Sequence, residues 1–213
     1  MTLTAPPGLI PRKTPRQQRA KVTVDAILEA TIQVLLRGGI AGLTTTNVAE
    51  RAGVSVGTMY QYFPNKQALI YALNAQYLDL LAQRIETTCT TNHGAPVTDM
   101  IEALVNTYWT AKTERADVTR ALYRSVVEMD NAALIHDFAA RTSAATETML
   151  RSASDVTFRD PAAINLTLVT VIFGAVRNAF ERGLDATNGD ALRVELIAMC
   201  QAYASARSTP DSS

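Results

Sequence analysis

The sequence predicts an all-helical protein with a small N-terminal helix-turn-helix domain and a larger C-terminal helical domain. Apolar residues recur at intervals of three and four over most of the 213 residues, which is the period of helices with one buried face. Residues 43–66 contain the pattern of two short helices joined by a glycine turn. The β-branched run at residues 169–172 has no turn signal close to either end, so a helix is favoured there as well.

The first predicted helix starts near residue 16 or 23 and ends at the two glycines that follow Arg37. Thr44 or Thr45 can cap the next helix, because a hydroxyl accepts a hydrogen bond from a free N–H of the first turn. Gly53 can adopt the left-handed conformation that ends this helix, and Ser55 can cap the following one. Such a pair of helices is a helix-turn-helix, whose second helix lies in a DNA major groove.

Residues across this stretch agree with a known family in order and spacing. They are Gly42, Leu43, Thr44, Thr45, Val48, Ala49, Ala52, Gly53, Val54, Ser55, Gly57, Thr58, Tyr60, Tyr62, Phe63, Asn65, Lys66 and Leu69. The stretch resembles the DNA-binding domain of the tetracycline-repressor (TetR) family of bacterial transcription regulators. The resemblance covers roughly residues 16–81, and the remaining helices are generic. It implies a homodimer that represses transcription and releases DNA when a small molecule binds.

The predicted division of the chain follows its composition and charge. Residues 1–15 contain four prolines and little to bury, which predicts a disordered basic arm. Residues 16–66 are the predicted DNA-binding domain. Residues 67–207 are the predicted ligand-binding and dimerisation domain, with a connecting helix over 67–83, and residues 208–213 are a loose tail.

The charges balance overall but not along the chain. The first 66 residues carry eight basic and three acidic residues, a net charge of +5, and the remaining twelve basic and seventeen acidic residues give −5. A basic head on an acidic body fits one nucleic-acid surface, although a charge asymmetry of this size is common. The arm could track phosphates or enter the minor groove, and a solvated tail is an equal alternative.

The C-terminal elements follow from apolar stripes and helix boundaries. The connecting helix starts at Lys66 and extends beyond Gln83, and the polar segment 87–96 is predicted to be a loop. Asp160 can cap a helix whose first residue is Pro161. The helices after the loop are predicted over residues 97–113, 117–129, 131–152, 161–182 and 190–206.

The helix over residues 161–182 is apolar on nearly all sides, so it must be covered on two faces. One face fits the core of its own domain. We expect the other face to meet a second subunit, with the helix over 190–206 beside it, in a four-helix bundle across a two-fold axis. The alternative is complete burial within one subunit.

A homodimer would place two recognition helices in successive major grooves, about 34–36 Å apart, so double-stranded DNA with a palindromic operator is the predicted partner. The resemblance implies that Thr45, Tyr60 and Lys66 contact phosphates. Ser55 is either a helix cap alone or also a DNA contact. The recognition helix contains no arginine, so DNA shape is expected to matter for recognition. The candidates for contacts with base edges are Thr46, Val56, Gly57, Thr58, Gln61 and Tyr62.

A small-molecule effector, largely apolar, is the other predicted partner. Methionines and aromatic residues suit a tolerant apolar pocket, although each of them is also a plausible core residue. The candidates for the lining are Met100, Tyr108, Trp109, Tyr123, Met129, Phe138, Met149, Phe173 and Arg177.

Other classes of function lack a signal in the sequence. We expect no enzyme, because no phosphate loop, nucleophile elbow or metal-ligand spacing is present, and no cofactor or metal is predicted. Cys89 and Cys200 are far apart, which suggests free thiols in a reducing compartment. The apolar run at residues 166–176 is shorter than the roughly 20 residues of a membrane span, so we expect a cytoplasmic protein. A transcriptional activator or a ligand-independent repressor of the same fold remains an alternative.

Overall fold

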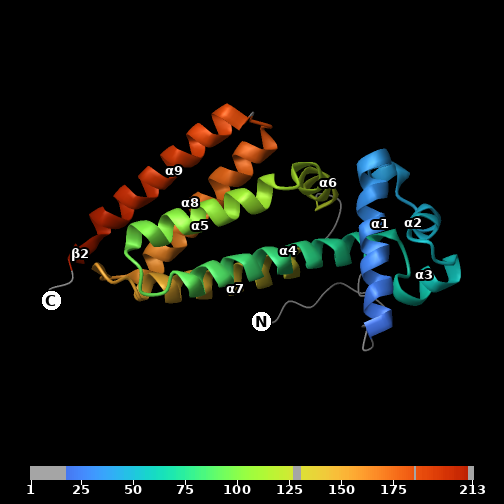
Figure 1. Ribbon diagram of the computed structural model, residues 1–213, viewed down its shortest axis with the longest axis horizontal. Coiled ribbons are helices and arrows are strands. Elements are labelled where there is room, and N and C mark those ends of the chain that lie inside the picture. The colour runs from blue at the N-terminus through green and yellow to red at the C-terminus, as the bar shows by residue number, and fades with distance from the viewer. Residues whose placement is uncertain (1–17, 127–130, 185, 211–213) are drawn as a thin grey trace. The chain divides into compact units, whose positions relative to one another are not determined.

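The computed structural model describes residues 18–126, 131–184 and 186–210, and this part of the chain is almost entirely helical (Figure 1). The predicted all-α class is therefore confirmed. Its helices are α1 (Gln18–Gly42), α2 (Thr45–Ala52), α3 (Val56–Tyr62), α4 (Lys66–Thr91), α5 (Val97–Thr113), α6 (Ala116–Val126), α7 (Ala132–Arg151), α8 (Pro161–Glu181) and α9 (Ala186–Arg207).

The described residues form two compact units. The first, which we call the head unit, comprises residues 18–78 together with 117–136. The second, the body unit, comprises residues 79–116 together with 137–210. Helix α4 is continuous and contributes its first half to the head unit and its second half to the body unit.

The core of the head unit is built from α1, α2, α3 and the first half of α4. Ile27, Met59, Phe63 and Leu69 are fully buried in it. Helix α6 completes this core, since its Val118 and Leu122 belong to the same buried cluster, although it lies about 50 residues beyond α3 in the sequence. Helix α6 lies within residues 67–207, which are predicted to form the C-terminal domain, and its Val118 and Leu122 pack in the core of the head unit.

The end of α1 agrees with the glycine pair in the sequence. Gly39 has a φ of 60° and a ψ of −164°, outside the helical region, so the helix breaks there and a short helical segment follows up to Gly42. A φ in this range is strained for residues with a Cβ atom, which explains why glycine occupies the break.

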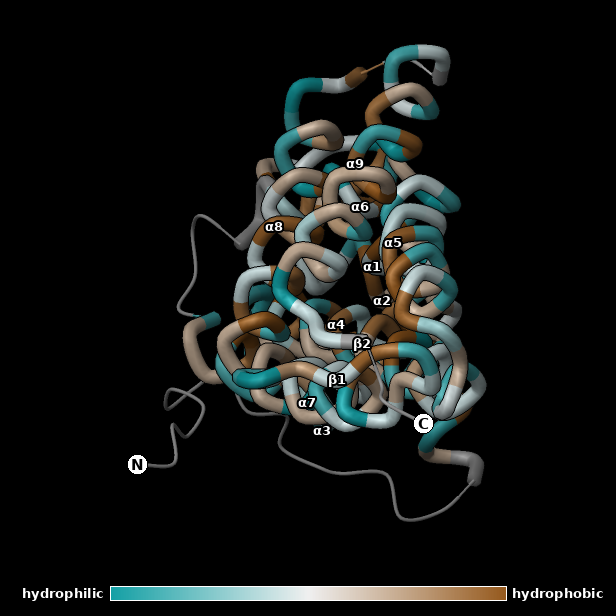
Figure 2. Tube along the Cα trace, turned by 90° about the vertical axis from the view of Figure 1, so that its left-hand side faces the viewer, coloured by the Kyte–Doolittle hydropathy of each residue, from teal (hydrophilic) through white to brown (hydrophobic). Residues whose placement is uncertain are grey.

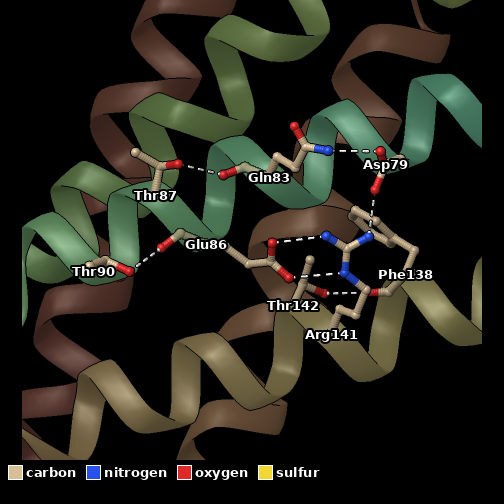
Figure 3. A network of polar contacts seen from close by, with 8 residues as sticks. All are labelled: Asp79, Gln83, Glu86, Thr87, Thr90, Phe138, Arg141 and Thr142. Carbon is tan, nitrogen blue, oxygen red and sulfur yellow. Dashed lines mark hydrogen bonds and ion pairs between the residues drawn. The ribbon is translucent and has the colours of Figure 1, made fainter. Parts of the chain in front are cut away.

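Helix α4 extends to Thr91, so the loop predicted over residues 87–96 was wrong for its first half. The hydroxyl of Thr87 donates to the carbonyl oxygen of Gln83 at 2.8 Å, and that of Thr90 donates to Glu86 at 2.9 Å (Figure 3). These hydroxyls bond to the preceding turn, so the polar threonines are compatible with a helix. The chain then turns at Gly94, which has a φ of 78°.

An ion-pair network joins α4 to α7 in the body unit (Figure 3). Arg141 on α7 donates to Glu86 through Nε and Nη2, both at 2.9 Å, and to Asp79 through Nη1 at 2.7 Å. The two carboxylates lie seven residues apart on one face of α4, and hydrogen bonds to them raise the pKa of Arg141. The arginine therefore connects α7 to two successive turns of α4.

The body core lies where α5, α8 and α9 pack together. Apolar residues of α5 and α8 are visible as brown stretches in Figure 2. As predicted, Asp160 caps α8, because its carboxylate accepts a hydrogen bond from the N–H of Ala163 at 3.0 Å, and Pro161 is the first helical residue. At 21 residues, α8 is long and apolar enough to cross a membrane, but its buried residues Ile164, Leu168 and Ile172 fit a core helix.

A short antiparallel ladder closes the C-terminal end of the body unit. Strand β1 (Val156–Phe158) follows α7, and strand β2 (Ser208–Pro210) follows α9. Thr157 pairs with Thr209, and their hydroxyl oxygens lie 2.9 Å apart. The loose tail predicted over residues 208–213 is therefore incorrect for its first three residues.

Candidate functional site

The turn between α2 and α3 is fixed by hydrogen bonds within the motif. The Thr44 hydroxyl accepts from the N–H of Asn47 at 3.1 Å and caps α2. Gly53 ends α2 in the left-handed conformation, with a φ of 67° and a ψ of 29°, and its N–H bonds to the carbonyl of Glu50. This confirms the predicted turn, and it identifies Thr44 rather than Thr45 as the cap.

Helix α3 has one buried face and one exposed face. The Ser55 hydroxyl accepts from the N–H of Thr58 at 3.0 Å and caps the helix. Met59 and Phe63 are fully buried in the head core, so they orient α3 and are not available to DNA. Val56 and Tyr60, by contrast, are 41% and 44% exposed. The orientation of α3 therefore follows from two apolar anchors on one face.

Two of the three predicted phosphate contacts touch each other. The hydroxyl oxygens of Thr45 and Tyr60 lie 3.1 Å apart, which joins the first residue of α2 to the exposed face of α3. Lys66 is the first residue of α4, and the side chain of Asn65 caps that helix by accepting from the N–H of Ala68 at 2.8 Å. Helix N-termini have free N–H groups and a partial positive charge, so these positions favour anions.

The other predicted DNA contacts differ in exposure. Thr46, Ser55, Gly57 and Gln61 are exposed, whereas Thr58 is half-buried. Tyr62 is partly buried and packs against the head core, so its ring has a structural role as well. The predicted basic arm lies outside the described residues.

Among the predicted effector residues, three aromatic rings form a row in the body unit. The rings of Tyr108 on α5 and Phe173 on α8 stack with centroids 4.2 Å apart and an interplanar angle of 18°. Phe138 on α7 follows, with its centroid 5.9 Å from that of Phe173. We call Phe138, Phe173 and Tyr108 the aromatic row. Met100 and Met149 are fully buried in the body unit.

The remaining predicted effector residues are dispersed. Trp109 lies against Gly189, where an added Cβ atom would come within 3.1 Å of the indole ring. Arg177 is exposed and donates to Glu181 at 2.7 Å. Tyr123 belongs to the head unit, and Met129 lies outside the described residues.

Sequence reasoning missed Lys112, which is only 2% exposed on α5. Its Nζ atom lies 5.2 Å from the centroid of the Tyr108 ring, a distance suited to a cation–π contact. Burial and, to a smaller extent, the nearby charge of Arg177 lower the pKa of Lys112 to about 7. The signal was present in the sequence, because Lys112 continues the stripe of Ile101, Val105 and Tyr108 at helical spacing.

Both cysteines are buried. Burial raises the pKa of Cys89 and of Cys200 to about 11, with the charge of Glu86 adding to the effect at Cys89. Both thiols are free and protonated at neutral pH, so they are poor nucleophiles.

An open groove of about 570 Å³ lies on the body unit between α4 and α5. Its lining is rich in hydroxyl and amide groups and contains none of the predicted effector residues. The lining residues are Leu80, Gln83, Arg84, Thr87, Thr88, Asn106, Thr107 and Thr110.

Known repressors resemble about a quarter of the chain. The transcriptional repressor KstR of Mycolicibacterium smegmatis is 44% identical over 52 residues, which are 24% of this chain and 26% of that protein. The class D tetracycline repressor of Escherichia coli is 34% identical over 59 residues, 28% of this chain and 27% of its own length. The chain thus spans about a quarter of the length of the relatives it matches.

The fold of the whole chain also has a solved counterpart. SmeT, the repressor of the Stenotrophomonas maltophilia multidrug efflux pump SmeDEF, superposes with a TM-score of 0.66. The match covers 89% of this chain and 91% of SmeT at 19% sequence identity. SmeT has also been solved as a complex with triclosan.

Two family profiles cover most of the chain. The profile of bacterial regulatory proteins of the tetR family matches residues 27–73. The profile of the tetracyclin repressor-like C-terminal domain matches residues 96–203, which is more than half of the chain. Together with the helix-turn-helix geometry, these matches show that the chain belongs to the TetR family of DNA-binding transcriptional regulators, a family that is not enzymatic.

Proposed function

We propose that this protein is a cytoplasmic, homodimeric repressor that binds a palindromic operator and is released by a small-molecule effector. The observation that carries the proposal is the hydroxyl pair of Thr45 and Tyr60 on the exposed side of the helix-turn-helix. The two hydroxyls can bind neighbouring oxygens of one phosphate, and Lys66 at the start of α4 adds a positive charge. Thr46, Val56, Gly57 and Gln61 are then the exposed candidates for contacts with bases.

The outer faces of α8 and α9 support the homodimer. Leu166, Val194 and Met199 are 67%, 56% and 52% exposed on these two helices. Large apolar side chains exposed on a helix are candidates for an interface. A second copy that places its own α8 and α9 on this surface would cover these residues in a four-helix bundle.

Release by an effector requires two states with different affinities for DNA. A ligand weakens DNA binding only if it binds the other state more tightly. Helix α4 runs without a break from Lys66 in the head unit to Thr91 in the body unit. Helix α6 contributes Val118 and Leu122 to the head core. Both helices are therefore suited to transmit a change to the DNA-binding residues. The solved complex of SmeT with triclosan supports a small molecule as the effector.

Binding of DNA by the purified protein tests the proposal. Fragments from its own upstream region and random DNA should be compared at two salt concentrations, because phosphate contacts weaken with salt. We expect a palindromic footprint, and Tyr60→Phe combined with Lys66→Ala should weaken binding by about tenfold or more. Arg151→Ala, which removes an exposed positive charge from α7 in the body unit, should leave binding unchanged.

The position of the footprint separates the proposal from its alternatives. Protection over the promoter fits a repressor, whereas protection upstream of it fits an activator. A complex that no effector releases fits a ligand-independent repressor. Equal affinity for operator and random DNA from a selected pool would contradict sequence-specific regulation.

A further inference from the structure

The open groove between α4 and α5 has a regular wall on the α4 side. The lining residues of α4 recur at intervals of three and four, so they form one continuous stripe over two turns of the helix. Two of them, Gln83 and Thr87, lie on the opposite side of α4 from Arg141 (Figure 3). The groove therefore lies on a different face of α4 from α7.

Two contacts join the walls of the groove. The hydroxyl oxygens of Thr88 on α4 and Thr107 on α5 lie 2.7 Å apart. Arg84 on α4 donates to the carboxylate of Glu114, the residue that follows α5, at 2.6 Å. Because both contacts connect α4 to α5, the groove has a defined width before a ligand binds. Such preorganisation reduces the entropy that is lost on binding.

Half of the eight lining residues are threonines, although threonine is a poor helix former. All four are exposed or half-buried, so core packing does not require their β-branched side chains. Alanine, lysine or glutamate would stabilise the two helices more at these positions. The fold alone therefore does not explain this concentration of hydroxyl and methyl groups. The four residues are Thr87, Thr88, Thr107 and Thr110.

The groove retains hydrogen-bonding groups of both kinds. Gln83 donates through Nε2 to Asp79 at 2.7 Å, which leaves its side-chain oxygen as an acceptor. Asn106 accepts through Oδ1 from Arg193 at 2.6 Å, which leaves its NH₂ group as a donor. Within the described part of the chain, these side-chain amides form no other hydrogen bond, and the Thr110 hydroxyl forms none. A ligand that both donates and accepts matches this mixture.

The charge in the groove is already paired. Among the eight lining residues, Arg84 alone is charged, and Glu114 is its partner. An anion would therefore have to compete with a carboxylate of the protein. The apolar part of the lining comprises the threonine methyl groups and Leu80, which is 54% exposed. The groove thus favours a neutral molecule that has some apolar surface.

We propose that this groove binds a neutral, hydroxyl-rich molecule, such as a sugar of one or two rings. Each sugar hydroxyl both donates and accepts, so it matches Gln83, Asn106 and Thr110, and the C–H face of the ring packs on Leu80. The volume of about 570 Å³ is within the range of small-molecule sites. The lining contains no residue predicted for the apolar effector, so the inference goes beyond the proposed function and does not depend on it.

Matched probes test the class of ligand. Binding of maltose, cellobiose and trehalose to the full-length protein is measured by NMR titration at pH 7. Tetraethylene glycol, a chain with ether oxygens in place of most hydroxyls, is the control. We expect at least one disaccharide to bind about tenfold more tightly than the glycol, the effect of one or two additional hydrogen bonds.

A second pair of probes tests the preference for a neutral ligand. Methyl β-glucuronide differs from methyl β-glucoside by a carboxylate in place of one CH₂OH group. Because Glu114 already pairs with Arg84, we expect the glucuronide to bind no more tightly than the glucoside.

Two isosteric variants assign binding to the groove. Thr110→Val removes an exposed hydroxyl of the groove and should weaken disaccharide binding about fivefold, the effect of one neutral hydrogen bond. Thr148→Val makes the same change at an exposed position of α7 outside the groove and should leave binding unchanged. Because both side chains are exposed, we expect both variants to fold, and their melting temperatures verify this.

Three outcomes would overturn the inference. No disaccharide binds more tightly than tetraethylene glycol, the glucuronide binds tenfold more tightly than the glucoside, or Thr110→Val binds the disaccharide as tightly as Thr148→Val does. None of these titrations contains DNA. Operator binding by the same preparation therefore tests the proposed function separately.

Discussion

The capping side chains of the helix-turn-helix and the buried Lys112 beside the aromatic row of the body unit have different kinds of partner. In the first region, Thr44, Ser55 and Asn65 lie at helix ends and bond to the backbone of their own helix within three residues. In the second, Lys112 is buried; the ring that it contacts, Tyr108, lies one turn before it on α5, and the charge that acts on it, Arg177, lies on α8. A polar side chain that bonds to its own helix produces a recognisable pattern in the sequence. A side chain whose partners lie far away in the sequence does not. The sequence pattern therefore revealed the caps of the first region but not the buried lysine of the second.

The largest expected effect tests whether α6, which is distant in the sequence, stabilises the core of the head unit. Leu122 is 4% exposed and belongs to the head core, although it lies far from α3 in the sequence. Leu122→Ala should lower the free energy of unfolding by about 2–4 kcal/mol, because it leaves a cavity in a packed core. Denaturant unfolding measures the loss, and operator affinity should fall with it.

Leu80→Ala is the matched control for this variant. Leu80 is 54% exposed on α4, so its truncation should change stability by less than about 0.5 kcal/mol. Equal losses in the two variants would show that α6 does not contribute to the head core.

The second effect concerns the buried lysine and its dependence on pH. Below pH 7, Lys112 is protonated in the folded and the unfolded state, and the folded state bears the full cost of burying the charge. Between the folded pKa of about 7 and the ordinary value of 10.5, the folded state releases this proton while the unfolded state keeps it. Stability should therefore rise with pH across this interval.

Comparison with Lys112→Met isolates this contribution. The stability of the unmodified protein relative to the variant should increase by about 2 kcal/mol from pH 7 to pH 9. Denaturant midpoints at several pH values measure the difference, and groups common to both proteins cancel. If the stability of the two proteins changes with pH in the same way, Lys112 is solvated. The contrast between the two regions would then be weaker.

The smallest effect concerns the local caps. Ser55→Ala removes the hydroxyl that accepts from the N–H of Thr58, so it should lower the stability of the head unit by about 1 kcal/mol. Ser55→Asp should retain most of this stability, because a carboxylate also caps a helix. Thermal unfolding of the two variants gives the comparison. If both lose the same stability, the hydroxyl of Ser55 does not act as a cap.

Local signals predicted most helix boundaries. Asp160 and Pro161 marked the start of α8, and Gly53 and Ser55 marked the turn before α3. These residues act on their own backbone, so their effect is independent of the rest of the fold.

The errors came from features that depend on distant or unusual partners. The polar segment after Glu86 was predicted to be a loop, but threonine hydroxyls bond to the preceding turn and keep it helical. The packing of α6 with the head and the burial of Lys112 depend on tertiary contacts. The stripe position of Lys112 was visible in the sequence, but lysines are usually exposed, so it was not among the candidate residues.

The pairing of β1 with β2 has a practical consequence for reporter fusions. Strand β2 follows α9 directly, and its register places Pro210 opposite Val156 at the loop between α7 and α8. A fluorescent protein or affinity tag joined to the C-terminal end would start from this ladder. Its linker should therefore begin after Pro210, and deletion of Ser208–Pro210 to shorten the fusion would expose the edge of β1 to pairing with other chains.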